Sequence, residues 1–83
     1  MTYTVIWTPR ATAGFRELKA RDGSDALKPV KTAVNALAQD PQPAGVSRLG
    51  PIYRLRVGPY RVTYKIDGQR VSIDVITVGR IPG

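Results

Sequence analysis

The chain opens with a short alternation of nonpolar and polar residues and then changes to a helical pattern. Residues 3–7 are rich in aromatic and β-branched side chains, which predicts a strand. Thr8 followed by Pro9 is typical of a helix start, because threonine caps free N–H groups and proline fits the first helical position. Asp22-Gly23 supplies the stop. The nonpolar positions of this helix recur at helical spacing: Ala11, Phe15 and Leu18.

A second helix follows almost at once. Ser24 and Asp25 are candidate caps, and Asp40-Pro41 marks the end. Because Pro29 lacks an N–H group, we expect it within the first turn, so that the helix begins near Asp25 or later. Prolines and glycines between residues 41 and 51 predict a connecting loop. The nonpolar stripe of this helix consists of Leu27, Val30, Val34 and Leu37.

The second half of the chain alternates with period two and predicts three strands. The strands cover residues 52–57, 60–66 and 71–78, joined by Gly58-Pro59 and Asp67-Gly68. Asp-Gly between nonpolar alternations is a strong signal for a two-residue hairpin turn. We therefore expect a meander of antiparallel strands.

Counting from the turns predicts the register of these strands. The Gly58-Pro59 turn pairs Val57 with Tyr60, Leu55 with Val62, Tyr53 with Tyr64 and Arg56 with Arg61. A two-residue turn at Asp67-Gly68 pairs Tyr64 with Val71, Val62 with Ile73, Tyr60 with Val75, Lys65 with Arg70, Thr63 with Ser72 and Arg61 with Asp74. One face is then nonpolar, with Tyr60, Val62 and Tyr64 in the core.

The other face of this predicted sheet is strongly basic. It carries Arg54, Arg56, Arg61, Lys65 and Arg70. Like charges opposite one another destabilise a sheet, and only Asp74 is near enough to offset them. Two interpretations are open: Arg61 pairs with Asp74 while the others extend into solvent, or the face is an anion platform for phosphate.

The amino-acid composition excludes several kinds of functional site. The 83 residues have ordinary globular usage, with 42% hydrophobic and 23% charged residues, which indicates one domain over residues 1–83. With no cysteine and no histidine, we exclude disulfides, thiol catalysis, common zinc sites and histidine acid–base catalysis, and we expect no metal and no cofactor. The net charge of +7 favours a polyanionic partner. No leader or membrane-spanning segment is evident, so we expect a soluble, cytoplasmic protein.

The chain resembles the RelE/ParE superfamily of type II toxin–antitoxin toxins. The resemblance rests on Tyr-Arg-Leu-Arg at 53–56, Tyr-Arg-Val-Thr-Tyr at 60–64 and Val-Gly-Arg at 78–80, and residues 3–11 and Asp40-Pro41 also fit. It implies an α+β, two-layer, RelE-like fold in the order β-α-α-β-β-β. A helical hairpin would pack on one face of a four-stranded, largely antiparallel sheet, with the first strand beside the last.

The resemblance also implies functions. RelE-like members are ribosome-dependent mRNA endonucleases and ParE-like members poison DNA gyrase, and an antitoxin neutralises both. In the RelE-like interpretation, Arg54 and Arg56 match cationic active-site positions and Arg61 matches the arginine that stabilises the phosphate transition state. Lys65, Arg70 and Arg80 would bind RNA. The implied partners are the ribosome with its mRNA and a cognate antitoxin in a hetero-oligomeric complex, with no membrane partner.

The sequence departs from this pattern after Arg80. Family members usually continue with basic residues and a tyrosine that contacts RNA, whereas here Ile81, Pro82 and Gly83 follow. Arginine also stays protonated and makes a poor general base. Three functions remain open: a nuclease that relies on the ribosome to orient its substrate, a gyrase inhibitor, and a non-catalytic antitoxin-binding module. The arginine-rich face favours the nuclease.

Overall fold

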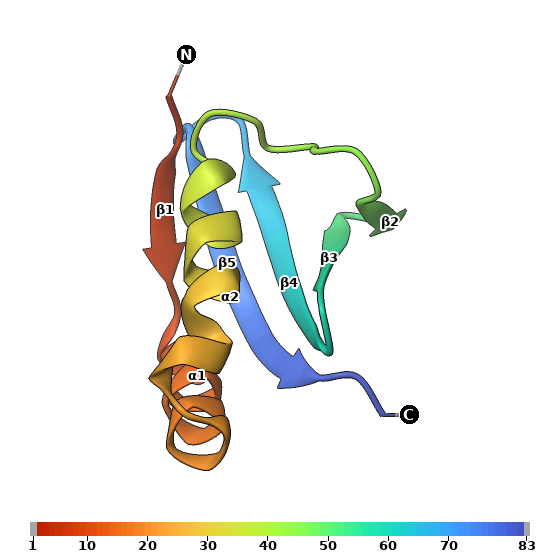
Figure 1. The fold of residues 1–83 in the computed structure, drawn as a ribbon. Coiled ribbons are helices and arrows are strands. Elements are labelled where there is room, and N and C mark those ends of the chain that lie inside the picture. Colours follow the sequence, from red (N-terminus) through yellow and green to blue (C-terminus); the bar gives the residue numbers. More distant parts are fainter. Residues whose placement is uncertain (1, 83) are drawn as a thin grey trace.

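Residues 2–82 are described by the computed structural model and form two layers, with a helical hairpin over one face of a sheet (Figure 1). The sheet order is β1-β5-β4-β3-β2, with β1 parallel to β5 and the other pairs antiparallel. The elements are β1 (Thr4–Trp7), α1 (Pro9–Asp22), α2 (Ser24–Ala36), β2 (Ser47–Leu49), β3 (Ile52–Val57), β4 (Tyr60–Asp67) and β5 (Ser72–Arg80).

The expected α+β fold is therefore confirmed, with one addition. β1 lies beside β5, as the resemblance implied. The expected sheet had four strands, but a short fifth strand, β2, forms within the segment 41–51 that the sequence predicted as loop. In the described part of the chain, neither helix has the length and nonpolar character needed to span a bilayer.

Helix α1 begins and ends as predicted. The Ala11 N–H donates to Thr8 Oγ1 at 3.2 Å, and the same hydroxyl donates to the Val75 carbonyl at 2.8 Å, which ties the helix start to β5. At the other end, Gly23 has a φ of 92°. Gly14 allows α1 to approach β5 closely, because a Cβ at this position would lie only 2.6 Å from the Val78 carbonyl oxygen.

Helix α2 begins at Ser24, immediately after Gly23, and its start has no side-chain cap. Pro29 is the sixth helical residue, so our expectation that it lies in the first turn is wrong. Its missing N–H leaves the Asp25 carbonyl without a helical partner. Both residues are exposed, so water can satisfy that carbonyl at little cost.

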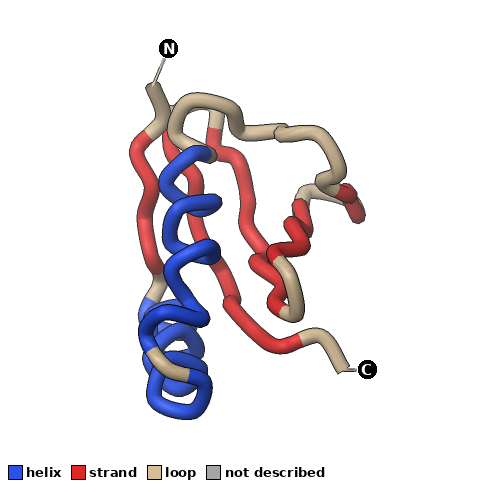
Figure 2. Tube along the Cα trace, in the orientation of Figure 1, coloured by secondary structure: helices blue, strands red, loops and turns tan. Residues whose placement is uncertain are grey.

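The core lies between the helices and the sheet (Figure 2). As predicted, Tyr60, Val62 and Tyr64 face the helices, and Val62 and Tyr64 are fully buried. Across from them, α2 contributes the predicted stripe: Leu27, Val30 and Val34, with Leu37 just after the helix. Phe15 is only partly buried and packs edge to face on Trp7, with a centroid distance of 5.3 Å.

Of the two predicted hairpin registers, the first is confirmed and the second is wrong. All four pairs predicted across the Gly58-Pro59 turn are present. The pairs predicted across Asp67-Gly68 are wrong, because β4 continues through Asp67 and the loop spans residues 68–71. Tyr64 pairs with Val75, four positions later than expected, and Arg61 lies opposite Gly79 rather than Asp74.

The Asp67 side chain explains this error. Its Oδ1 accepts the N–H groups of Gln69 at 3.1 Å and Arg70 at 3.0 Å, so the aspartate closes a longer loop from inside the strand. From Tyr64 to Asp67 the shift is four positions, an even number, so Ile73 and Val75 of β5 keep their predicted inward face. A bulge in β5 opposite Thr63 and Tyr64 absorbs one more residue and restores inward alternation at Val78.

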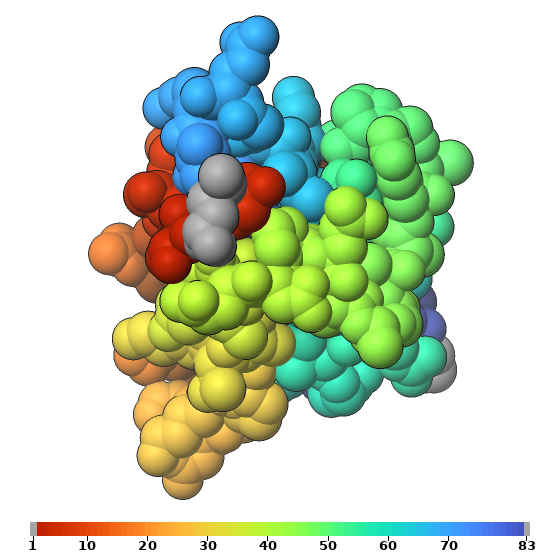
Figure 3. Space-filling view, turned by 90° about the horizontal axis from the view of Figure 1, so that it is seen from above, coloured from red at the N-terminus to blue at the C-terminus, as the bar shows by residue number. Residues whose placement is uncertain are grey.

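Tyr64 links the sheet to the loop that follows α2. Its ring stacks on Tyr53 with centroids 5.5 Å apart, and its hydroxyl donates to the Pro41 carbonyl at 2.7 Å. This loop crosses the upper end of the molecule (Figure 3). Burial is the main cause that raises the pKa of Tyr64 to about 12.

We expect the protein to lose stability as pH rises from about 10 toward 12. In this range the unfolded tyrosine releases its proton while folded Tyr64 keeps it, so deprotonation favours unfolding. Urea denaturation at a series of pH values measures the effect. Tyr64→Phe should show a smaller decline, and an equal decline in both proteins would contradict the assignment.

Candidate nucleic-acid interface

Three arginines lie together on the sheet face opposite the helices. Arg54 and Arg56 come from β3 and Arg61 from β4, and Arg56 is directly opposite Arg61. We call these three residues the arginine cluster. Its placement follows from strand alternation, because the neighbouring residues Tyr53 and Val62 are buried on the helical side.

The guanidinium groups of the cluster are available to an anion. Arg61 is exposed, and the exposed Arg56 is partly fixed because its Nε donates to the Gly58 carbonyl at 3.2 Å. Arg54 Nε is buried and lacks a hydrogen-bond partner within residues 2–82. A buried donor without an acceptor is costly, so a bound anion or water would relieve it.

The carboxylate expected to neutralise the cluster lies elsewhere. Asp74 is opposite Lys65 and accepts a hydrogen bond from the Ser72 hydroxyl at 3.1 Å. Among residues 2–82, the ion pairs are Lys28–Asp25 and Arg80–Asp22. The arginine cluster therefore keeps its full positive charge.

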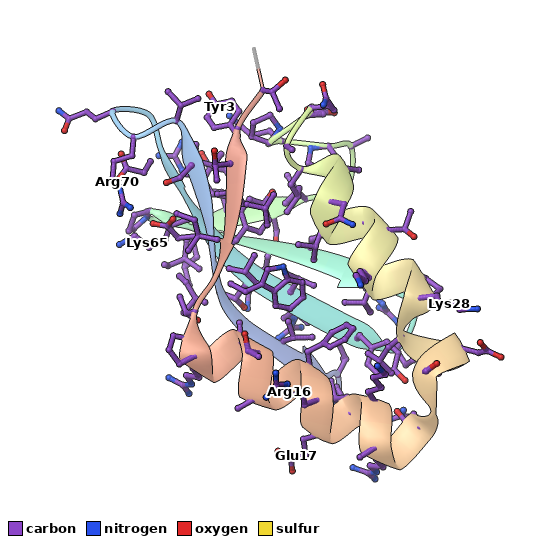
Figure 4. All side chains as sticks on the ribbon, turned by 90° about the vertical axis from the view of Figure 1, so that its left-hand side faces the viewer. Tyr3, Arg16, Glu17, Lys28, Lys65 and Arg70 are labelled. Atoms are coloured by element: carbon purple, nitrogen blue, oxygen red, sulfur yellow. The ribbon has the colours of Figure 1, made fainter. Side chains whose placement is uncertain are left out.

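The other predicted RNA-binding residues are dispersed. Lys65 is exposed on β4 and Arg70 is in the loop 68–71, and both lie on the opposite side of the sheet from α2 (Figure 4). The expectation that Arg70 faces Lys65 across a strand pair is wrong, because the loop is longer than predicted. Arg61 lies near the start of β4, whereas Lys65 lies near its end and Arg70 in the loop after it.

Arg80 lies at the rim of the helical side of the sheet. It is opposite Tyr60, and its guanidinium forms a 3.1 Å ion pair with Asp22 at the end of α1. The Tyr60 hydroxyl donates to the same carboxylate at 2.6 Å, which raises the pKa of Tyr60. The role of Asp22 was not predictable from the sequence, in which Asp22-Gly23 indicates only the end of a helix.

A different surface runs between the two helices. Phe15 and Trp7 contribute to a depression of about 250 Å³ whose rim includes Lys19 and Lys31. A second depression of about 190 Å³ continues along α2 past Leu27. We call these adjoining depressions the helix groove. Their charged rim consists of Arg16, Lys19, Lys28 and Lys31.

The described residues contain no group of three or more acidic, cysteine or histidine side chains placed to hold a metal ion. The arginine and lysine side chains within residues 2–82 can bind anions. Guanidinium groups held on strands suit phosphate, because they donate two hydrogen bonds in a fixed fork.

Comparison with known protein families gives a match over residues 5–80, to the family described as the ParE toxin of the type II toxin–antitoxin system parDE. This range includes both helices, the arginine cluster and β5. No curated protein matches the sequence significantly.

Solved toxin structures share the fold over nearly the whole chain. A mutant of the E. coli toxin RelE in complex with an antitoxin RelB peptide is 25% identical, with a TM-score of 0.78 over 100% of this chain and 87% of that chain. The toxin–antitoxin complex RelBE2 of Mycobacterium tuberculosis is 24% identical, with a TM-score of 0.75 over 96% of this chain and 99% of that chain. The chromosomal ParDE system of P. aeruginosa is 18% identical, with a TM-score of 0.80 over 98% of each chain.

Proposed function

The chain belongs to the ParE toxin family, within the RelE/ParE superfamily of type II toxin–antitoxin toxins, and we propose that it is a ribosome-dependent mRNA endonuclease. The observation that carries this proposal is the arginine cluster. Arg56 faces Arg61 across two strands with no carboxylate to offset the repulsion within residues 2–82. A phosphodiester backbone supplies the missing charge.

The proposed reaction is attack of a ribose 2′-hydroxyl on its own adjacent phosphate. The 2′-oxygen forms a bond to phosphorus, the bond to the 5′-oxygen breaks, and the proton released at the 2′ position is matched by one gained at the 5′-oxygen. Arg61 stabilises the charge that builds on the phosphate, and Arg54 and Arg56 hold the flanking groups. Because the chain has no histidine to act as general acid or base, the reaction depends more on the ribosome, which positions the substrate.

Addition of the purified protein to translating ribosomes tests the proposal. Cleavage of the bound mRNA, with cyclic phosphate ends, is the expected result. The family match to ParE toxins favours a second candidate, inhibition of DNA gyrase. Loss of gyrase supercoiling without any mRNA cleavage would replace the nuclease by this alternative.

The proposal includes a cognate antitoxin, which docks through an acidic segment on the helix groove. The groove has a nonpolar floor that includes Trp7, Phe15 and Leu27, within a positively charged rim. Charge complementarity therefore selects an amphipathic, acidic chain, which orders as it binds. Several related structures contain antitoxin together with toxin.

Reversal of charge on the groove should weaken antitoxin binding. For Lys19→Glu/Lys31→Glu we expect a loss of at least about tenfold in affinity, since two favourable charge contacts become repulsive. Titration calorimetry with the cognate acidic protein provides the measurement. The matched control is Arg10→Glu/Arg70→Glu, which changes the net charge equally away from the groove. Equal losses in both variants would indicate only a general charge effect.

A further inference from the structure

A second basic hollow lies at the other end of the molecule from the loop that crosses over α2. It has a volume of about 470 Å³ and is lined by residues of α1, of β3 and the turn after it, and of the end of β5 and the segment that follows. Three elements each contribute one arginine to it. Its lining residues are Arg21, Arg56, Pro59, Arg80, Ile81 and Pro82.

Two of the three arginines are held in place by the surrounding structure. Arg56 Nε donates to the Gly58 carbonyl. Arg80 is held by Asp22 at 3.1 Å and lies over the Tyr60 ring, 6.0 Å from its centroid. Because the Tyr60 hydroxyl fixes the same carboxylate at 2.6 Å, the Arg80 guanidinium is positioned before any ligand arrives.

The charge of the hollow is only partly balanced. Asp22 forms its ion pair with Arg80, whereas Arg21 and Arg56 have no ion pair within residues 2–82. An excess of positive charge in a preformed hollow attracts an anion. The nonpolar lining by Pro59, Ile81 and Pro82 suits the sugar or base of a nucleotide better than a free inorganic ion.

We propose that this hollow is a phosphate-binding site for single-stranded RNA, separate from the scissile position, and that Arg21 is one of its ligand-binding residues. The inference rests on the proposed nuclease function. Arg56 connects the two sites, because it lies opposite Arg61 on the outer face and also lines the hollow. One RNA strand thus follows the Gly58-Pro59 turn from the arginine cluster to the hollow.

The test measures binding of a short single-stranded RNA that carries 2′-O-methyl groups and so cannot be cleaved. Fluorescence anisotropy of the labelled RNA is followed against the full chain at several salt concentrations. Arg21→Ala should weaken binding about fivefold to tenfold and reduce the slope of log affinity against log salt by about 0.7, the value for one phosphate contact. Arg21→Lys should recover part of the loss, because it retains charge without the bidentate fork.

Arg10→Ala is the matched control, because it removes the same side chain from an exposed position of the same helix that lines neither the hollow nor the helix groove. Equal RNA affinity of Arg21→Ala and wild type, or equal loss in both alanine variants, would overturn the proposal. The proposal would also be overturned if Arg21→Ala weakened antitoxin binding but not RNA binding, since the hollow would then belong to a protein interface.

The two proposals fail separately. If wild type cleaves ribosome-bound mRNA but Arg21→Ala binds RNA as well as wild type, the nuclease proposal is supported and the proposed RNA site in the hollow is wrong. Conversely, a selective loss of RNA affinity in Arg21→Ala supports the hollow even if wild type cleaves no mRNA.

Discussion

Arg61→Ala is expected to lower cleavage of ribosome-bound mRNA by about 10²–10³, the usual loss when a preorganised charge contact to a transition state is removed. Induced expression should then no longer arrest growth. The fold should persist, because Arg61 is exposed on β4 and its removal ends the repulsion with Arg56. The rate is measured by primer extension on translating ribosomes, with thermal melting as the check on folding.

The structure also determines the correct control for this experiment. Sequence pairing makes Asp74→Ala the natural comparison, but Asp74 lies opposite Lys65 and reports nothing about Arg61. Arg10→Ala is the better control, since it removes the same charge from an exposed position of α1. If Arg10→Ala slows cleavage as much as Arg61→Ala, general electrostatic attraction explains the loss and the catalytic role is wrong.

Val62→Asp is expected to unfold the domain. Val62 is fully buried on the helical side of β4, between Leu55 and Val78 on the neighbouring strands. A carboxylate without a partner in this position costs several kcal/mol, against a total stability of roughly 5–10 kcal/mol for a small domain. Circular dichroism should show loss of the cooperative thermal transition.

Arg61→Asp provides the comparison for this second experiment. It places the same carboxylate one residue away, on the exposed face beside Arg56, where attraction replaces repulsion. This variant should melt within a few degrees of wild type. A folded Val62→Asp protein with a similar melting temperature would show that the core is not where the structure places it.

The contrast between the two hairpins shows what the sequence could predict. Strand alternation puts Tyr53, Leu55 and Val57 on one face, and the two-residue turn at Gly58-Pro59 sets their register, as the structure confirms. Asp67-Gly68 has the composition of a two-residue turn, but the carboxylate of Asp67 caps a longer loop instead. Local composition alone does not distinguish these outcomes.

Of the two candidate sites, one was predictable from the sequence and the other was not. The arginine cluster depends only on strand alternation and on the first hairpin, so the sequence could place it. The hollow depends on where the end of α1 meets the end of β5, and therefore on the bulge that sets Arg80 opposite Tyr60. No local signal connects Arg21 with Arg80, because they are far apart in the sequence and belong to different elements.

The place of β5 in the sheet has a consequence for synthesis of the toxin. β5 pairs with both β1 and β4, yet the ribosome makes it after every other strand of the described chain. While β5 is still inside the exit tunnel, β1 has no neighbour and the nonpolar side of β4 is incompletely covered. The five-stranded sheet therefore cannot close until residue 80 has left the tunnel.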